Sequence, residues 1–490
     1  MHHTAAHPTL RQARIAAGLA AIVGVSVLLR VGTMNIGYGI DEAISVGVAS
    51  HDLADIPATL RLDSSPPLYY LLLHEWMALF GTGEAATRTL SLLFALAAIP
   101  VGWWAGRALF GVRGGWLAAA GAAGCPFLTR YAQETRMYSL VVLLSLVACA
   151  AFALAFLHGR RIHLMTLAVA LTLLLYTHDW GLFLVGGMGL VWLGLWRRGD
   201  VRGRDGPLVA AVVLAAYAPW APTLVFQARH TGAPWGQAPS VEALLGVPGR
   251  LLGDLAVPLL ALLGTELLRR RGPGHREVCL LLVLAAGVAS IAWLSSQAEP
   301  AWTSRYLAVV LGPLLLAAAG AAAVGGRWTA AALIGIAVGW ALTAPPTVKS
   351  EARDVARALP VRVGAGDVVA CTLPELVPAV AHYLPTGARF VTPIGAVADP
   401  GVTDWRDAME RLRAGGNLER AVAGLPSGHV LVLVTPLLEA PRDPWLAVVA
   451  QRTRQWRAAL TRDPRLRSLG AVGSSTPHQN AVRAEVFVKV

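Results

Sequence analysis

The sequence is poor in charge. Only 14% of its 490 residues are Asp, Glu, Lys or Arg, while 55% are hydrophobic. A soluble domain is typically about 25% charged, so this composition excludes an ordinary soluble protein and predicts a membrane protein. Lysine is almost missing, since Lys349 and Lys489 are the only two in the chain. The length allows a membrane domain and one smaller domain.

Cysteine and nucleotide-binding motifs are also scarce. The chain has four cysteines, and no CxxC or other metal-ligand spacing occurs, so no disulfide framework or cysteine-bound metal is indicated. No GxGxxG or P-loop sequence follows a strand-like run, so no nucleotide site is signalled. The net charge of +12 is divided among short stretches between apolar runs. It therefore does not form the basic patch that nucleic-acid binding would require.

Eleven apolar runs have the character of membrane spans, which need roughly 20 mostly apolar residues. They cover residues 15–34, 86–106, 114–130, 136–157, 162–178, 180–196, 207–226, 248–268, 277–296, 304–324 and 327–345. The run at 66–80 is apolar but short, so we expect it to lie in the interface or to be re-entrant. The predicted fold is a polytopic α-helical membrane protein with about eleven transmembrane helices.

The arginines between the runs predict the orientation of the chain. If 66–80 does not cross, the arginines at 11, 14, 107, 113, 160, 161, 197–204, 269–276 and 327 share one side. Cytoplasmic loops carry the excess of Lys and Arg, so this side is predicted to be cytoplasmic. No small-residue cleavage site clearly follows the first run, which favours a retained anchor over a signal peptide. The N-terminus is then cytoplasmic and the C-terminal region extracytoplasmic.

The composition changes after Pro345 and Pro346. Charge rises, strand-like runs occur at 367–371, 389–392, 429–435 and 481–490, and helical patterns occur at 375–382, 404–413 and 445–460. Alternating strands and helices predict a small α/β domain. We therefore expect a membrane domain at 1–345, with an external loop at 35–85, and an extracytoplasmic α/β domain at 346–490. This second domain would serve as a lid, an acceptor platform or a stabilising cap.

Asp41 and Glu42 lie just after the first apolar run, in the external loop. Adjacent acids in a loop are often merely solvated. At the membrane surface, however, a partly desolvated carboxylate would have a raised pKa and would suit a general base. This position makes Asp41 the leading candidate for chemistry.

Two arginines stand at the ends of spans on the same side, Arg136 in the stretch 130–138 and Arg305 in the stretch 302–306. An Arg at mid-bilayer costs about 2.5–3.5 kcal/mol on insertion scales, so both should stay near the interface or face a polar cavity. A guanidinium matches phosphate geometry. The alternatives are anchoring by Arg and aromatic residues, and a structural ion pair between Arg130 and Glu134.

Two histidines carry weaker signals. His178 stands beside Asp179 in a turn on the same side, but no second His lies at ligand spacing, so a metal site is poorly supported. His74 belongs either to the polar face of an interfacial helix or to the lining of a pocket.

Taken together and in this order, five motifs resemble the glycosyltransferase-C superfamily. They are the Asp-Glu pair, Pro-Pro-Leu-Tyr-Tyr, Tyr-Ala-Gln-Glu-Thr-Arg-Met-Tyr, Tyr-Thr-His and Ser-Arg-Tyr-Leu. The sequence is most similar to the protein O-mannosyltransferase and aminoarabinose-transferase-like group (glycosyltransferase family 39-like). The resemblance covers roughly residues 15–345, and the C-terminal region is much less specific.

The resemblance implies roles for individual residues. Asp41 would be the catalytic base and Glu42 would help bind the acceptor, while Arg136, Arg305 and Ser65 would border the donor phosphate. Relatives often have Lys or His where this chain has Ser65, which leaves the two arginines as the better phosphate ligands. The pocket would also include Tyr70, His74, Gln133, Glu134, Tyr138, His178 and Tyr306.

The implied activity is inverting transfer of mannose, arabinose or a similar sugar from a polyprenyl-phosphate carrier to a hydroxyl. The acceptor would be a protein, lipid or glycan at the outer face of a bacterial inner membrane, and no nucleic acid is involved. No nucleotide or redox cofactor is required, although Asp41, Glu42 and Asp63 could share a divalent cation with phosphate oxygens. The alternatives are a transporter or flippase of a lipid-linked sugar, although we find no internal repeat, and a membrane scaffold whose α/β domain binds a partner.

Overall fold

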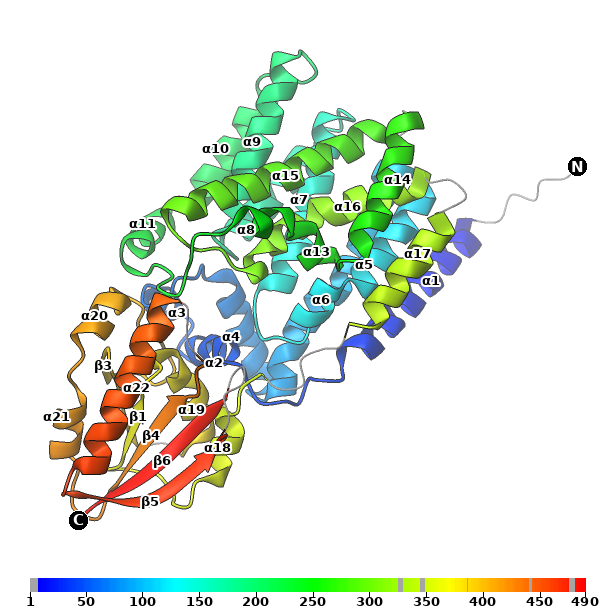
Figure 1. Ribbon diagram of the computed structural model, residues 1–490. Helices are drawn as coiled ribbons and strands as arrows, with labels where there is room; N and C mark the ends of the chain where they lie inside the picture. The colour runs from blue at the N-terminus through cyan, green and yellow to red at the C-terminus, as the bar shows by residue number, and fades with distance from the viewer. Residues whose placement is uncertain are drawn as a thin grey trace, which may run out of the picture.

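The computed structural model describes residues 8–270, 272, 274–324, 329–343, 349–385, 387–439, 443–475 and 481–490. Arg327 and the expected domain boundary at 345–346 lie outside these residues. A bundle of helices adjoins a smaller sheet domain, and the short helices α2 and α4 lie between the two (Figure 1).

The helices of the bundle follow the apolar runs of the sequence. They are α1 (Pro8–Arg30), α5 (Glu84–Gly124), α6 (Pro126–Tyr131), α7 (Tyr138–Phe156), α8 (Ile162–Leu175), α9 (Gly181–Arg197), α10 (Asp205–Tyr217), α11 (Ala221–His230), α12 (Val241–Leu245), α13 (Val247–Leu252), α14 (Ala256–Arg270), α15 (His275–Ala298), the 3₁₀ turn η1 (Ser304–Leu307), α16 (Ala308–Val324) and α17 (Thr329–Ala341). Five helical stretches in the described part of the chain are long and apolar enough to cross a membrane, or six if α10 and α11, bent by 73°, count as one. A multi-pass helical membrane protein is confirmed, whereas the number eleven is not.

One of these elements, α5, combines two predicted spans. It breaks at Gly111, whose φ of +78° is easily adopted only by glycine. The two arms then pack against each other, because a Cβ at Gly102 would lie 3.1 Å from the carbonyl oxygen of Ala118. Small residues allow this close approach between helices. The runs at 86–106 and 114–130 therefore form one hairpin.

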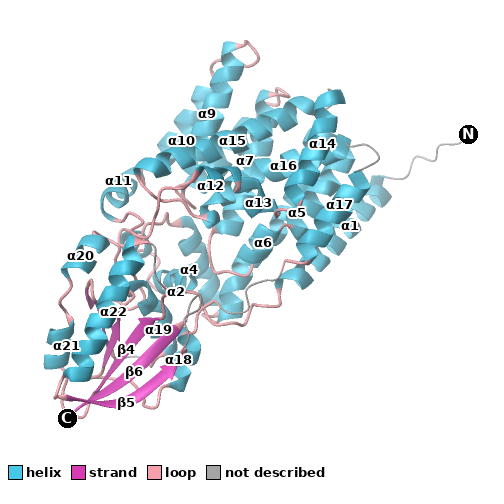
Figure 2. Cartoon of the chain, viewed as in Figure 1, coloured by secondary structure: helices cyan, strands magenta, loops and turns pink. Residues whose placement is uncertain are grey.

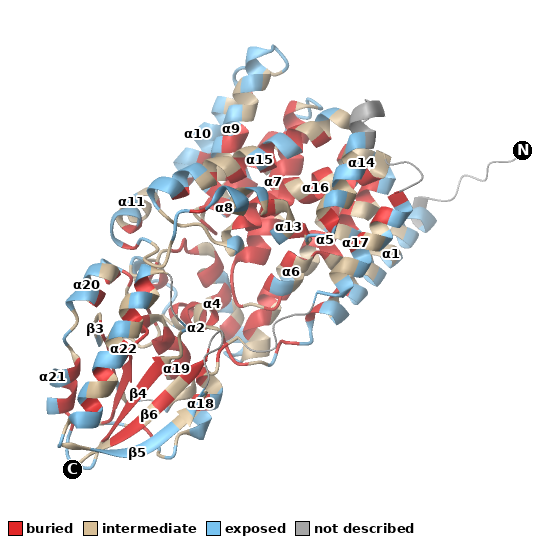
Figure 3. Ribbon diagram, viewed as in Figure 1, coloured by how far each residue is buried: buried red, intermediate tan, exposed pale blue. Residues whose placement is uncertain are grey.

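The bundle is built around α7. Its sequence is apolar on all sides. Of its most apolar 18-residue stretch, 89% is buried, whereas the corresponding stretch of α1 is 6% buried. A helix that is hydrophobic all round belongs in the interior of its protein. Figure 3 shows the contrast between the buried centre of the bundle and the exposed surface of α1. The loops at the ends of α7 and its neighbours are thereby held on a rigid frame.

Three short helices follow α1 on the side of the bundle that meets the sheet domain: α2 (Ile40–Ala49), α3 (Ile56–Thr59) and α4 (Leu68–Phe80). The first turn of α2 is closed by a capping interaction in which the backbone N–H of Gly39 donates to Glu42 Oε2 at 2.9 Å. Asp41 and Glu42 also suit the positive end of the helix dipole. With 13 residues, α4 is shorter than a typical span, and its interfacial or re-entrant placement stays a prediction.

The C-terminal region forms a six-stranded mixed sheet in the order β3-β2-β1-β4-β6-β5. The strands are β1 (Val368–Cys371), β2 (Arg389–Thr392), β3 (Gly395–Val397), β4 (Val430–Pro436), β5 (Leu466–Gly473) and β6 (Val482–Lys489). The helical elements are α18 (Ala352–Ala358), the 3₁₀ turn η2 (Pro374–Leu376), α19 (Val377–Tyr383), α20 (Ala408–Ala414), α21 (Leu418–Ala423) and α22 (Pro444–Arg462). Strand β1 is parallel to β2 and β4, and the other pairs are antiparallel. Figure 2 shows the helices beside this sheet.

The predicted α/β character of this region is confirmed, but two strands were not predicted. The four apolar strand-like runs became β1, β2, β4 and β6. Strand β5 lies at the sheet edge and is mostly exposed, so it lacks the apolar signal of a buried strand. Strand β3 has only three residues. Among the helices, α18 and α21 also went unpredicted.

The sheet domain docks tightly on α2. A Cβ added to Gly47 would overlap the carbonyl oxygen of Gly401, so the two backbones are in direct contact. His51 Nε2 lies 2.5 Å from Asp399 Oδ2. The backbone N–H of Trp405 donates to the carbonyl oxygen of Leu62 at 2.9 Å. These contacts join the sheet domain to the segment that carries Asp41.

Candidate active site

A cavity of about 820 Å³ lies where α2, the chain before α4, the segment after α6, the turn after α8 and η1 meet the sheet domain. Eleven acidic, basic and histidine side chains line this cavity. They are Asp41, Glu42, Asp63, Arg130, Glu134, Arg136, His178, Asp179, Arg305, Lys349 and Glu375. This volume falls within the range of small-molecule sites.

Asp41 and Arg305 form an ion pair inside this cavity. The distance from Arg305 Nη1 to Asp41 Oδ2 is 2.6 Å, and the side chains are 26% and 39% exposed, respectively. Burial would raise the pKa of Asp41, but Arg305 and then Arg136 outweigh this effect, and the pKa lies below its ordinary value of 3.8. The raised pKa expected from the sequence is therefore wrong for this structure, because the sequence did not reveal the partner Arg305.

Arg136 lies beside this pair in the irregular segment between α6 and α7. Its Nη1 donates to Ser45 Oγ at 3.0 Å and to the carbonyl oxygen of Asp41 at 3.3 Å, and its guanidinium carbon lies 5.7 Å from the ring centre of Tyr138. The Nε atoms of Arg136 and Arg305 are buried without a hydrogen-bond partner among the described residues. Two neighbouring guanidinium groups with unused donors form an environment suited to an anion.

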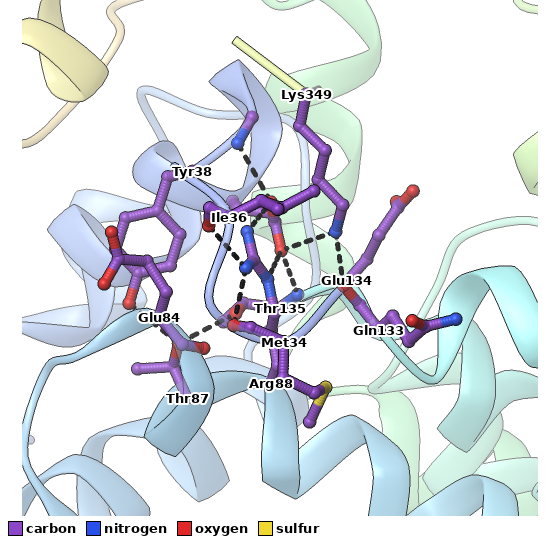
Figure 4. A network of polar contacts seen from close by, with 12 residues as sticks. Met34, Ile36, Tyr38, Glu84, Thr87, Arg88, Gln133, Glu134, Thr135 and Lys349 are labelled. Atoms are coloured by element: carbon purple, nitrogen blue, oxygen red, sulfur yellow. Dashed lines mark hydrogen bonds and ion pairs between the residues drawn. The ribbon is translucent and has the colours of Figure 1, made fainter. Parts of the chain in front are cut away.

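Glu42 faces a different set of partners. Its two carboxylate oxygens accept hydrogen bonds from Nε and Nη2 of Arg88, both at 2.8 Å. Oε1 also accepts from the N–H of Thr135 at 2.9 Å and from Lys349 Nζ at 3.2 Å. Figure 4 shows Arg88, Thr135 and Lys349 converging in this network. Burial alone would raise the pKa of Glu42, but the hydrogen bonds from Arg88 and the charge of Lys349 hold it below its ordinary value.

Arg88 ties the entry of α2 to α5. Its side chain is fully buried, and Nη1 donates to the carbonyl oxygens of Met34 at 2.8 Å and Ile36 at 2.6 Å, while Nη2 reaches Gly37 at 3.2 Å. Sequence reasoning missed this residue. A signal was present, because a cation near the beginning of α5 lies at the unfavourable end of the helix dipole and needs a carboxylate partner such as Glu42.

Two further carboxyl groups of the cavity, Asp179 and Asp63, have raised pKa values. Burial, with the negative charge of Asp63 as a second cause, raises the pKa of Asp179 to about 7. Burial also raises the pKa of Asp63 itself, and the Tyr70 hydroxyl donates to its Oδ2 at 3.4 Å. Arg130 and Glu134 form the ion pair predicted from the sequence, at 3.5 Å. The cavity therefore combines ionised pairs with carboxyls that can be neutral.

His178 is a neutral group in the same wall. Burial, followed by the charges of Arg136 and Arg305, lowers its pKa to about 3. Its Nδ1 accepts a hydrogen bond from the N–H of Trp180 at 3.1 Å, which leaves the proton on Nε2. Its ring stands edge-on to Tyr306, with 4.8 Å between centroids. Neutral His178 can donate a hydrogen bond in the cavity but does not act as a cation.

Most of the predicted site residues reach the cavity. Its wall includes Asp41, Glu42, Ser65, Glu134, Arg136, His178, Arg305 and Tyr306. Both oxygens of Glu42, however, are already engaged by protein donors, so the structure favours a structural role. Its predicted part in binding the acceptor stays a prediction.

Four predicted pocket residues lie outside the cavity wall. Tyr70 is packed behind Arg136, whose Nη1 reaches its hydroxyl at 3.4 Å. His74 Nδ1 is 3.0 Å from the carbonyl oxygen of Ala49. Gln133 holds Thr33 and donates to the carbonyl of Thr129, and Tyr138 lies beside Arg136 at the start of α7. Tyr70 and Tyr138 therefore contact Arg136 outside the cavity wall, whereas His74 and Gln133 bind other parts of the chain.

Lys349, Glu375 and Trp405 are among the wall residues that sequence reasoning did not find. Lys349 comes from the chain before the sheet domain, and Glu375 and Trp405 come from the domain itself. None belongs to a motif near Asp41. As for metals, the described residues contain no cluster of three His, Cys, Asp or Glu side chains that could hold an ion. Asp41, Glu42 and Asp63 do not form the divalent-cation site considered above, because Arg88 and Lys349 already bind the carboxylate of Glu42.

No protein family model and no curated protein matches this sequence. Among solved structures, ArnT from Cupriavidus metallidurans is similar over 97% of this chain and 98% of its own, at 14% identity. The TM-score is 0.61 for the apo state and 0.57 for the form bound to undecaprenyl phosphate. The Archaeoglobus fulgidus oligosaccharyltransferase in complex with Zn and sulfate is similar at a TM-score of 0.50 and 13% identity, over 86% of this chain and 68% of its own. At these identities the likeness shows the fold, and it confirms the resemblance expected from the motifs at that level.

The Glu42–Arg88 pair makes a stability prediction. Glu42→Gln keeps the shape of the side chain but leaves the buried charge of Arg88 without its carboxylate. Breaking a buried pair in this way costs about 3–5 kcal/mol, and denaturant unfolding in detergent should show a loss of this size in the free energy of unfolding. Asp200→Asn is the control, because its pair with Arg276 is exposed and 3.7 Å long, and such pairs contribute at most about 1 kcal/mol. Equal losses for the two variants would contradict the prediction.

Proposed function

We propose that this protein is an inverting glycosyltransferase that moves a sugar from a polyprenyl-phosphate carrier to an acceptor hydroxyl at the outer face of a bacterial inner membrane. The observation that carries the proposal is the meeting of Asp41, Arg136 and Arg305 in one cavity beside apolar helices. The shared fold with ArnT, which has been solved bound to undecaprenyl phosphate, supports a lipid phosphate as the carrier. The sugar is a hexose or pentose such as mannose or arabinose, and the acceptor is a protein, lipid or glycan.

Asp41 is the proposed general base. As the acceptor oxygen attacks the anomeric carbon, its proton passes to the Asp41 carboxylate, and the bond from that carbon to the phosphate oxygen breaks. Attack from the face opposite the phosphate inverts the anomeric configuration. The polyprenyl phosphate departs as a stable anion, so the leaving group needs no proton. A carboxylate that is already ionised at neutral pH, as Asp41 is here, is ready for this role.

Arg136 and Arg305 are the proposed ligands of the phosphate. Negative charge grows on the phosphate oxygens as the glycosidic bond breaks, and fixed donors aimed at such a charge stabilise the transition state. Both guanidinium groups retain buried Nε donors that have no partner in the described part of the chain. Neutral His178 and the Ser65 hydroxyl line the same cavity and can add uncharged hydrogen bonds.

The Asp41–Arg305 pair also couples donor binding to base strength. In the structure, Arg305 is the first of the two cations that lower the pKa of Asp41. A phosphate that binds Arg305 competes with Asp41 for the same guanidinium. As Arg305 turns to the phosphate, burial regains its effect and the pKa of Asp41 rises. The carboxylate would then become a stronger base only when the donor is in place.

Replacing Asp41 tests the base. Asp41→Asn should reduce transfer from labelled undecaprenyl-phosphate sugars by about 10²–10⁴-fold, the usual contribution of a general base. Affinity for undecaprenyl phosphate should be kept or increased, because Arg305 loses its competing carboxylate. The control is Asp55→Asn, an exposed acid of the same loop. Turnover by Asp41→Asn at the control rate would contradict the assignment.

Replacing the arginines tests the phosphate site. Arg136→Ala and Arg305→Ala should each raise the dissociation constant of undecaprenyl phosphate roughly tenfold to a hundredfold, since a hydrogen bond to a charged group contributes about 1.5–3 kcal/mol. Without Arg305 the pKa of Asp41 should rise, so the acid limb of the pH–rate profile should move to higher pH. Arg61→Ala, at an exposed arginine outside the cavity wall, is the control. Unchanged affinity in both variants would remove them from the phosphate site.

The orientation of the chain is also open to test. We propose about eleven spans, a cytoplasmic N-terminus and an extracytoplasmic C-terminus, because the arginine-rich connections then share the cytoplasmic side. A reporter enzyme fused after Val490 should be active only outside the cytoplasm, while one fused in the segment 197–204 should report the cytoplasm. The reverse pattern would overturn both the orientation and the side on which Asp41 works.

A further inference from the structure

The sheet domain reaches into the cavity. Glu375 from η2, Trp405 from the chain before α20 and Leu446 from α22 all line it. The backbone N–H of Trp405 donates a hydrogen bond to the carbonyl oxygen of Leu62, which fixes Trp405 to the helical part of the chain. Its ring centre lies 4.6 Å from that of Trp235, another lining residue. The sheet domain thus contributes one aromatic, one aliphatic and one carboxyl side chain to the wall.

Glu375 has one oxygen in use and one unused. Its Oε1 accepts a hydrogen bond from Trp445 Nε1 at 3.0 Å, and Trp445 is fully buried, so the carboxyl group is held in place. Its Oε2 is buried and has no partner among the described residues. Leaving a buried polar atom unpaired is unfavourable, and such an atom in a cavity wall can be satisfied by a bound ligand.

The charges around Glu375 indicate which part of a ligand it could meet. Burial, together with the negative charges of Asp41 and Asp443, raises the pKa of Glu375 to about 7. A carboxyl with this surrounding repels phosphate, which the cavity can hold at Arg136 and Arg305. A hydroxyl group suits it in either protonation state, because the neutral acid donates and the carboxylate accepts.

We propose that Glu375 binds a hydroxyl group of the substrate, with Trp405 and Trp235 forming the apolar surface beside it. The inference rests on the proposed glycosyltransferase function and deepens it. The hydroxyl belongs either to the sugar of the donor or to the acceptor, and the same carboxyl chemistry serves both. The sheet domain then supplies part of the substrate site, which explains its rigid docking on α2 through Gly47 and Gly401.

The experiment compares binding and turnover in the full-length protein. Wild type, Glu375→Gln and Glu375→Ala are titrated with undecaprenyl phosphate and with its mannosyl and arabinosyl forms, and transfer to endogenous acceptors in membranes is measured at saturating donor. Glu485→Gln is the matched control, because its carboxylate pairs with Arg457 at 2.6 Å in the same domain and lies outside the cavity wall. Glu375→Gln keeps an oxygen that can accept the hydrogen bond from Trp445, so it should fold even if Glu375→Ala does not. Melting temperatures of both variants show whether either is misfolded.

Both Glu375 variants should bind sugar-free undecaprenyl phosphate as the wild type does. If the sugar is the partner, the preference of Glu375→Ala for a sugar-charged lipid should fall about 3- to 10-fold. Glu375→Gln should lose less, because its amide can still donate to a hydroxyl. If the acceptor is the partner, this preference should persist while transfer at saturating donor falls by a similar factor. If neither measurement changes in the Glu375 variants relative to Glu485→Gln, this inference is wrong and the proposed function is unaffected. Failure of the wild type to bind any of the three lipids would instead overturn the proposed function, and this inference with it.

Discussion

Glu42 and Arg88 form a two-pronged ion pair where both side chains are almost completely buried. Taking two charges out of water is costly, and the cost is offset only when the geometry is good and the remaining hydrogen-bonding positions are filled. Here the N–H of Thr135 and the Lys349 ammonium fill them. The pair joins α2, α5 and the segment after α6 at one point. Because Asp41 precedes Glu42 in the same helical turn, fixing Glu42 also fixes the backbone that carries Asp41.

The two adjacent acids therefore have separate tasks. Glu42 is held by a saturated network that leaves it no free oxygen. Asp41, by contrast, pairs with Arg305 and is partly exposed to the cavity. A fully satisfied ion pair builds rigidity, while a pair at a cavity wall can exchange partners. The difference arises from their positions on α2, which direct Glu42 towards α5 and Asp41 towards η1. In the proposed mechanism, the saturated pair positions the acid that reacts.

The sheet domain is part of the same construction. It touches α2 backbone to backbone, and its residues Glu375 and Trp405 complete the cavity wall. The expectation of a lid, platform or cap treated the domain as an addition to a finished site. In the structure, residues of the sheet domain form part of the cavity wall. In the proposed mechanism, this arrangement lets a lipid phosphate and a polar substrate group be held by different parts of one chain.

Local sequence determined much of this protein. The apolar runs predicted the helices, the strand-like runs predicted four strands, and the motifs around Asp41, Arg136 and Arg305 predicted residues that do meet in one cavity. These signals are short in range, because hydropathy and capping act within one element. Only the tertiary structure decided which charge pairs with which. Arg88 and Lys349, which pair with Glu42, are 46 and 307 residues away from it along the chain. Arg305, which pairs with Asp41, is 264 residues away from its partner. No local pattern encodes such a meeting. The pKa of Asp41 was mispredicted for this reason, since a pKa depends on neighbours in space and not on neighbours in sequence.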